Sequence, residues 1–247
     1  MKPRDATPIE RATAGDAAEI AELYLASRTD ALPFLRRVHP NPDPFRRPAG
    51  MTVEAFADFL VDEFRDTVAR IGADRIGAFI AEPIQASGGV IVPPPGYLKR
   101  IRDLCRDNDI RYISDEVVTA FGRLGHVFAS GEVFDIEPDM ITFAKGVTSG
   151  YFPLGGVVIS ERLLEEMRKT NRPDALFGHG LTYSSHPIGC ALALKNLDLL
   201  ENGALAHART VAPYFQARLK ELEELPLVGE VRGVGLMACV ECVADRD

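Results

Sequence analysis

Hydrophobic residues recur at helical spacing in two stretches of the first third of the chain. From Asp16 to about Arg28, an aspartate suited to capping a helix precedes apolar positions three and four residues apart. After Thr52, a longer apolar stripe comprises Val53, Phe56, Leu60, Phe64, Val68 and Ile71. The pattern predicts two amphipathic helices, the second capped by Thr52. Five prolines between them, in residues 33–50, predict an extended surface connection.

Short apolar runs alternate with helical patterns after Gly72. The runs are IGAFIA, IRYIS, DMITFA and GGVVIS, and the helical patterns are GYLKRIRDLCRDN and ERLLEEMRK. Runs that are apolar at successive positions are typical of strands in a mostly parallel sheet that is covered on both faces. We therefore predict an α/β domain with helices on both faces of its sheet.

The last part of the chain continues with two helices and a hairpin. Apolar spacing predicts helices from Pro187 to Glu201 and from Ala204 to about Glu224. Beyond Pro226, the sequence VGEVRGVGLMACVECV predicts two strands around a glycine turn. We expect this hairpin to begin a second domain.

Composition excludes several classes of partner. The chain has 247 residues, 46% of them hydrophobic, and a formal net charge of −8 with both signs scattered along its length. It can bury a real core, but it offers no basic stripe for nucleic acid or an anionic membrane. It also lacks an apolar run of membrane-spanning length and the core of a signal peptide. We expect a cytoplasmic protein with neither nucleic acid nor membrane as a partner.

The four cysteines are too few and too scattered for a disulfide framework. Cys239 and Cys242 form a C-x-x-C pair, but they lie in a predicted strand, where residues three apart point to opposite faces. There is no second pair and no histidine nearby, so we expect no metal site.

Three predicted strands end in a charged residue. Glu82 follows IGAFIA, Asp115 follows IRYIS, and Lys145 follows DMITFA. Ligands of open α/β sheets bind outside the carboxyl ends of the strands, so these residues are the candidates for a functional site.

Lys145 follows mostly apolar residues that should draw it into the core. Burial disfavours the ammonium form and favours a neutral amine, which a lysine needs to form a Schiff base. A lysine that ends a strand and extends to water explains the same position. Four glycines at 146, 150, 155 and 156 favour the first interpretation, because they leave room for a flat ring.

Asp115 would be a partly buried carboxylate, which is costly unless it meets a cation or several donors. A protonated pyridine nitrogen is such a partner, and Val117 is placed to lie against a ring face. Capping of a helix in EVVTAF is the alternative role for Asp115. Further along, Thr182 lies in a hydroxyl-rich run before a predicted helix, a setting that favours phosphate binding.

Four motifs together resemble the class III aminotransferases. They are AEPIQ (81–85), SDEVVTAFGRLG (114–125), PDMITFAKG (138–146) and HGLTYSSHP (179–187), in the family's order and at suitable spacing. The resemblance runs from about Leu32 to Val243. It implies a pyridoxal-phosphate (PLP) enzyme of fold type I, the aspartate-aminotransferase type, with a large domain on a mostly parallel sheet and a smaller second domain.

The resemblance also implies a role for each candidate residue. Lys145 would be the Schiff-base lysine and the base that moves a proton between substrate and cofactor, Asp115 the partner of the pyridine nitrogen, and Val117 the residue packed under the ring. Thr182 would bind the cofactor phosphate in the neighbouring subunit's site, which implies a homodimer. The reaction would move an amino group from an amine or amino acid to a 2-oxo acid such as pyruvate.

Two positions depart from ornithine and 4-aminobutyrate aminotransferases. Val118 stands where many members have glutamine, and Ser87 stands where they have a glutamate that partners a gating arginine. Both changes resemble the amine:pyruvate, or omega, branch. We therefore expect a donor whose amine is away from a carboxylate, and pyruvate as the acceptor.

The resemblance further implies that family segments are missing. Residues 1–31 resemble neither the family's phosphate loop nor its ring-stacking aromatic, and the chain stops before the segment with the substrate-binding arginine. We expect a chain truncated at both ends, with residues 32–225 a partial PLP-binding large domain and residues 226–247 the start of a small domain. Two alternatives stay open: a catalytically incomplete remnant that acts as a folded or partner-binding module, and a PLP aminomutase or racemase.

Overall fold

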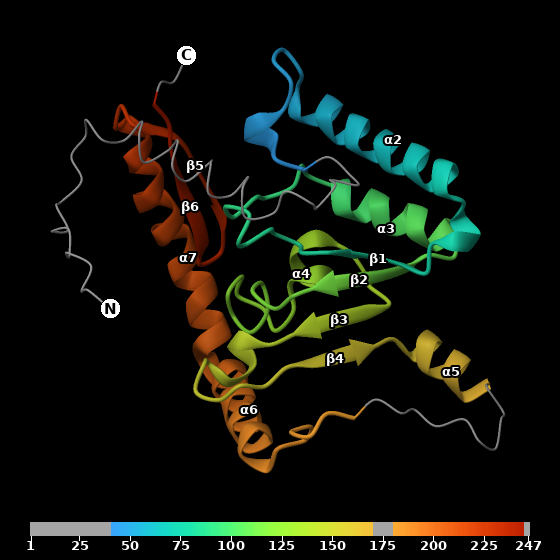
Figure 1. Cartoon of the computed structure of the whole chain (residues 1–247). Coiled ribbons are helices and arrows are strands. Elements are labelled where there is room, and N and C mark those ends of the chain that lie inside the picture. The colour runs from blue at the N-terminus through green and yellow to red at the C-terminus, as the bar shows by residue number, and fades with distance from the viewer. Residues whose placement is uncertain (1–40, 170–179, 245–247) are drawn as a thin grey trace, which may run out of the picture.

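A four-stranded sheet forms the centre of the computed structural model, which describes residues 41–169 and 180–244 (Figure 1). Its order is β1 (Ala78–Ala81), β2 (Arg111–Asp115), β3 (Met140–Phe143) and β4 (Gly156–Ile159). The first three strands are parallel, and β4 runs antiparallel to β3. The mostly parallel sheet predicted from the apolar runs is confirmed.

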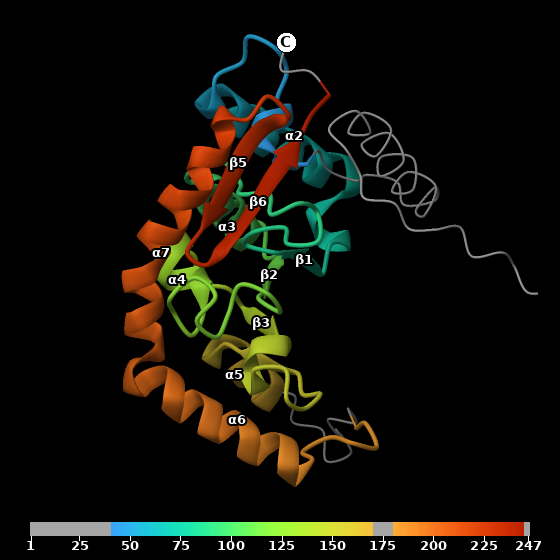
Figure 2. The same cartoon turned by 90° about the vertical axis from the view of Figure 1, so that its left-hand side faces the viewer.

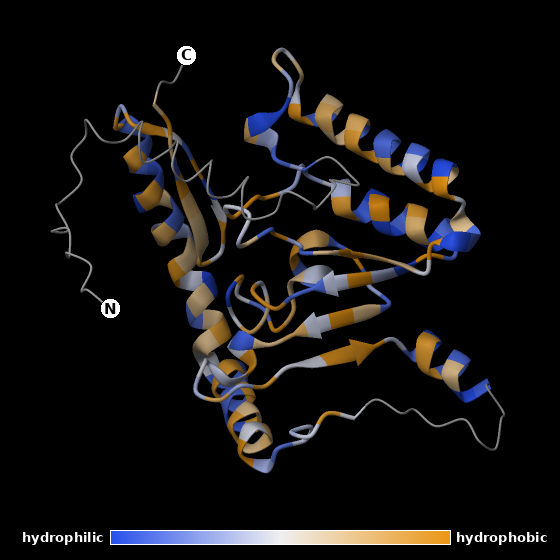
Figure 3. Ribbon diagram, viewed as in Figure 1, coloured by the Kyte–Doolittle hydropathy of each residue, from blue (hydrophilic) through white to orange (hydrophobic). Residues whose placement is uncertain are grey.

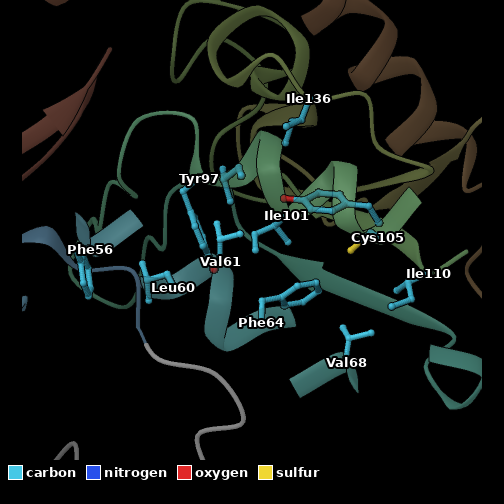
Figure 4. Close-up of a cluster of buried hydrophobic side chains, with 12 residues drawn as sticks. Phe56, Leu60, Val61, Phe64, Val68, Tyr97, Ile101, Cys105, Ile110 and Ile136 are labelled. Atoms are coloured by element: carbon cyan, nitrogen blue, oxygen red, sulfur yellow. The ribbon is translucent and has the colours of Figure 1, made fainter. Parts of the chain in front are cut away.

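Two helices cover one face of this sheet. Helix α2 (Val53–Ile71) begins after Thr52, whose side chain accepts a hydrogen bond from the Ala55 amide at 3.1 Å, as the sequence predicts. Helix α3 (Tyr97–Asp107) packs against α2 and β2, and its buried side chains share one hydrophobic cluster with those of α2 (Figure 4). Leu60 and Ile101 are fully buried with Tyr112 of β2. Burial of each such side chain stabilises the fold by about 1.5–3 kcal/mol.

The other face of the sheet is open in the described part of the chain. Ile80 on β1 and Val157 on β4 are 57% and 56% exposed, and β3 and β4 carry strongly apolar colours in Figure 3. The register pairs Ile80 with Ile113 and Thr142 with Val157, so these side chains share a face with Asp115. Helices were expected on both faces, and the described residues provide them for one.

Three helices follow the sheet. Helix α5 (Glu161–Lys169) comes directly after β4, and α6 (Pro187–Leu199) and α7 (Leu205–Lys220) lie along the edge where the parallel strands end (Figures 1 and 2). A π-helical turn, η5 (Leu200–Ala204), joins α6 and α7, and Gly203 takes a φ of 138° at the kink. The two helices predicted here are therefore present, and a 3-10 turn, η6 (Glu221–Glu224), ends the second.

The predicted hairpin is also present. Strands β5 (Val228–Val234) and β6 (Met237–Cys242) form a separate antiparallel sheet. Its turn reaches the loop after β2, where the Leu236 amide donates to the Arg123 carbonyl at 2.9 Å. Arg232 of β5 reaches the loop after β1 and donates to the Gly89 carbonyl. The hairpin therefore contacts the loops that follow two neighbouring strands.

Several expectations concern other segments. The predicted helix from Asp16 to Arg28 lies outside the described residues, and so does the first part of the proline-rich connection. The described remainder of that connection contains one 3-10 turn, η2 (Pro44–Arg46).

The four cysteines are free thiols, and of the C-x-x-C pair Cys239 is partly buried and Cys242 is exposed. Among the described residues, no helix has the length and apolar character needed to cross a membrane.

Candidate active site

The ends of β2 and β3 bring two of the candidate residues to one region of the sheet. Asp115 is the last residue of β2 and pairs in register with Thr142 of β3. Lys145 comes three residues after Thr142, at the start of the 3-10 turn η4 (Lys145–Thr148). Glu82, after β1, instead turns back on its own loop, where its carboxylate accepts from the Ala86 amide at 3.0 Å.

Asp115 is partly buried and keeps one carboxylate oxygen available. Its Oδ1 accepts a hydrogen bond from the Val117 amide at 3.1 Å, and within the described residues no partner is recorded for Oδ2. The segment EVVTAF forms turns, and no helix begins there. Capping of a helix by Asp115, the alternative role, is therefore not what the structure shows, and the second oxygen can take a ligand.

Lys145 is exposed, which differs from the buried position expected from the sequence. The backbone explains the difference. After Ala144, which has a φ of −161°, Lys145 takes a φ of 42° in the left-handed region, and this turns the chain out of the sheet. In the described part of the chain no side chain pairs with the Lys145 amine. Among the described residues, the Lys145 amine therefore has no ion-pair partner and the side chain is exposed to solvent.

The turn that carries Lys145 is packed against the loop after β2. A Cβ added to Gly146 would lie 2.9 Å from the Phe121 Cβ, so only glycine allows this approach. The Phe121 ring lies 5.6 Å from both the Phe128 and Phe143 rings, centroid to centroid. This aromatic contact fixes the two loops to each other.

Asn196 of α6 holds the same turn from the other side. Its Nδ2 donates to the Gly146 carbonyl at 2.8 Å and to the Val147 carbonyl at 3.1 Å. Asn196 was missed in the sequence analysis. The sequence carries no clear signal for it, because Asn196 lies in a helix that also carries Lys195 and Asp198 and its role depends on contacts with a distant turn.

A cavity of about 290 Å³ opens beside the Lys145 turn. Val117 and Lys145 both line it, together with Phe121, Gly146, Leu200 and Leu236. Asp115 is not among the lining residues, although its carboxylate is hydrogen-bonded to the Val117 backbone. The structure thus brings Lys145 and Val117 to one cavity and places Asp115 beside it.

Thr182 is not brought to this cavity. It is exposed in the turn before α6, where the Leu181 amide donates to Ser184 Oγ at 3.2 Å. His179, the first residue of its motif, lies outside the described residues. Within residues 41–169 and 180–244, no group of three or more His, Cys, Asp or Glu side chains is arranged to hold a metal ion.

Two further residues beside Asp115 were not singled out from the sequence. Among the described residues, the buried Thr142 hydroxyl has no hydrogen-bond partner. Glu116 is fully buried and accepts several hydrogen bonds. Neither is detectable in a single sequence, because both depend on contacts between strand ends and distant segments.

These residues fit the cofactor that the motifs imply. PLP needs an amine for its aldehyde and a carboxylate for its ring nitrogen. Among the described residues, neither the Lys145 amine nor Asp115 Oδ2 has a hydrogen-bond or ion-pair partner. The unpartnered Thr142 hydroxyl, on the same face as Asp115, adds a buried polar group near the site. Lys145 and Asp115 would therefore hold the group, with Val117 beside its ring.

Comparisons with known proteins agree with this chemistry. The family model described as Aminotransferase class-III matches residues 29–247. The putrescine–pyruvate aminotransferase of Pseudomonas aeruginosa is 40% identical over 198 residues, which are 79% of this chain and 42% of that protein.

Two solved structures are similar in fold as well as in sequence. An (S)-enantioselective omega-transaminase from Thermomicrobium roseum has a TM-score of 0.78 and 46% identity over 83% of this chain and 45% of its own. The omega transaminase of Pseudomonas jessenii in complex with PMP has a TM-score of 0.80 and 38% identity over 84% of this chain and 46% of its own. The chain therefore spans less than half the length of these relatives.

Proposed function

This chain belongs to the class-III aminotransferases and has their fold, that of fold type I PLP enzymes, and on that basis we propose that its protein transfers amino groups with PLP. One observation of the site carries the proposal. Asp115 ends β2 and Lys145 follows the neighbouring parallel strand β3, and each offers an atom without a partner among the described residues. The relatives are aminotransferases, which favours transfer over an aminomutase, a racemase or a non-catalytic remnant.

Each residue has a defined task in this proposal. When bound, PLP supplies a carbonyl for the amino group and a ring that withdraws electrons. Lys145 Nζ would hold the cofactor until the substrate amine displaces it, and the released Lys145 amine would then move a proton between the substrate carbon and the cofactor. Asp115 Oδ2 keeps the ring nitrogen protonated, and the Val117 side chain supports one ring face.

The substrate class follows from two loop positions. Ser87 lies in the loop after β1, whose ends are joined by the pairing of Gln85 with Ile91, and Val118 lines the cavity beside Lys145. Neither side chain carries a charge or an amide that would bind a second carboxylate. We therefore propose an omega-type donor with its amine away from a carboxylate, and pyruvate as acceptor, as the name of the Pseudomonas aeruginosa relative indicates for that protein.

A homodimer is part of the proposal. Thr182 lies away from the cavity of its own chain, in an exposed apolar region that includes Leu181 (69% exposed), Tyr183 (81%), Ile188 (56%) and Leu194 (69%). A surface of this kind is typical of a protein–protein interface. Thr182 would then bind the cofactor phosphate of the neighbouring subunit.

The domain division and the location are also part of the proposal. Residues 32–225 would form the large domain and residues 226–247 the beginning of the small one. The four free thiols support a cytoplasmic location.

Product analysis tests the function. The protein is incubated with PLP, a diamine donor and pyruvate, and alanine is measured alongside the Lys145→Ala variant. We expect alanine to form only with the wild type. An isomerised amino acid without alanine would favour an aminomutase or racemase, and cofactor binding without either product would favour the remnant.

A further inference from the structure

Glu116 is a fully buried carboxylate directly after Asp115. Its Oε2 accepts hydrogen bonds from the Ala129 amide at 2.6 Å and from the Thr119 hydroxyl at 3.2 Å. Its Oε1 accepts from the Ser130 amide at 2.9 Å and from the Ser130 hydroxyl. Each oxygen of this carboxylate therefore faces a backbone amide, which can only donate, so a side-chain NH2 group in place of either oxygen would meet a donor.

These contacts join the end of β2 to the start of α4 (Ala129–Phe134). The Glu116 amide donates to the Thr142 carbonyl at 2.9 Å, which extends the pairing of β2 and β3 by one residue. Ser130 Oγ also reaches Ser114 Oγ at 2.9 Å. The backbone on both sides of Asp115 is thus fixed to a neighbouring strand and to a helix.

Asp115 and Glu116 point to opposite sides of the sheet. Successive side chains alternate along a strand, and Ser114, on the helix-covered face, is 0% exposed, whereas Asp115 is partly exposed on the open face. The next residue, Val117, donates its backbone amide hydrogen to Asp115 Oδ1. A shift of the Glu116 backbone would therefore move the hydrogen bond that orients the Asp115 carboxylate.

We propose that Glu116 is a positioning residue: its buried carboxylate clamps the end of β2 to α4 and thereby fixes the Val117 amide that aims Asp115 at the cofactor ring nitrogen. The aim of Asp115 at a cofactor rests on the proposed function. The contacts that clamp β2 to α4 belong to the chain itself and do not depend on a cofactor. Burying a carboxylate costs more free energy than capping a six-residue helix with an exposed serine or aspartate. Because Glu116 follows Asp115 directly, its buried carboxylate also holds the backbone that orients Asp115.

The clamp is tested first without cofactor, by amide hydrogen exchange of the wild type and the Glu116→Gln variant. Glutamine keeps the shape of the side chain but places an NH2 group against the backbone N–H of Ala129 or Ser130. Glu132→Gln is the matched control, because Glu132 lies in the same helix and its side chain is 70% exposed. We expect exchange at Ala129, Ser130 and Val117 to accelerate about tenfold in Glu116→Gln and to stay unchanged in Glu132→Gln. Acceleration at Ala129 and Ser130 alone would show that Glu116 merely caps α4, and would overturn the proposal.

The effect on Asp115 is tested by a double-mutant cycle on PLP affinity. Glu116→Gln should weaken binding about tenfold in the wild-type background and have little effect in an Asp115→Asn background, because the two residues act through one contact. An equal loss in both backgrounds would overturn the link to Asp115. If the wild type binds no PLP, the proposed function fails, and hydrogen exchange still tests whether Glu116 clamps β2 to α4.

A second variant covers the case in which Glu116→Gln does not fold. Ser130→Ala removes one donor to Glu116, and the same amides are expected to exchange about threefold faster. No change at Val117 would again contradict the clamp.

Discussion

Asp115 and Thr142 are register partners on neighbouring parallel strands, and both side chains lie on the open face of the sheet. Because Lys145 follows Thr142 by three residues, this pairing brings the Asp115 carboxylate and the Lys145 turn to the same end of the sheet. The pairing also places the unpartnered Thr142 hydroxyl next to the carboxylate. The proposed function depends on this local arrangement rather than on the whole fold.

The Thr142 hydroxyl gives a stability prediction. Thr142→Val removes a buried hydroxyl that has no hydrogen-bond partner in the described part of the chain, so in urea unfolding without cofactor we expect the free energy of unfolding to rise by about 1 kcal/mol. Thr119→Val is the matched control. Thr119 is 1% exposed and its hydroxyl donates to Glu116, so this change should lower the free energy of unfolding by about 1–2 kcal/mol. Equal losses in both variants would show that Thr142 has a partner.

Gly146 tests the packing that holds the Lys145 turn. An alanine Cβ at this position would lie 2.9 Å from the Phe121 Cβ, so Gly146→Ala should destabilise the protein by about 1–3 kcal/mol in thermal or urea unfolding. Gly131→Ala is the control, because no described residue lies within 4 Å of an added Cβ there and α4 would gain a better helix former. If Gly146→Ala were as stable as Gly131→Ala, the two loops would not be in close contact.

The cysteines give a prediction about reactivity. Cys105 is 0% exposed, and burial raises the pKa of its thiol to about 12, so almost no thiolate forms at pH 8. Cys242 is exposed. A thiol reagent at pH 8 should therefore label Cys242 readily and Cys105 only after unfolding, as measured by mass spectrometry of digested protein. Rapid labelling of native Cys105 would contradict the packing of α3 on β2.

Periodicity predicted the regular elements well, because their signals are local. The stripe after Thr52 and the apolar runs that became β1 to β4 each carry their pattern within a few residues. Helix α4 was missed because it has six residues, one of them Gly131, and begins where a distant carboxylate accepts its first amides. Its start is set by tertiary contacts that no local pattern records.

The site was predicted less completely than the fold. Strand ends identified Asp115 and Lys145 as candidates, but the apolar run before Lys145 gave no sign of its left-handed backbone and therefore none of its exposure. The supporting contacts from Glu116 and Asn196 join segments 13 and 50 residues apart in the chain. Such contacts depend on how strands and helices assemble, which residue spacing alone does not specify.

Absorbance spectroscopy with added PLP tests the central claim most directly. PLP is titrated into the wild type, into Lys145→Ala and into Lys195→Ala, a control at an exposed lysine whose side chain pairs with Asp198 on the surface of α6. We predict a protein-dependent visible band for the wild type and for Lys195→Ala, and its loss in Lys145→Ala. A Lys145→Ala spectrum indistinguishable from that of the wild type would contradict the assignment of Lys145 as the residue that binds the cofactor.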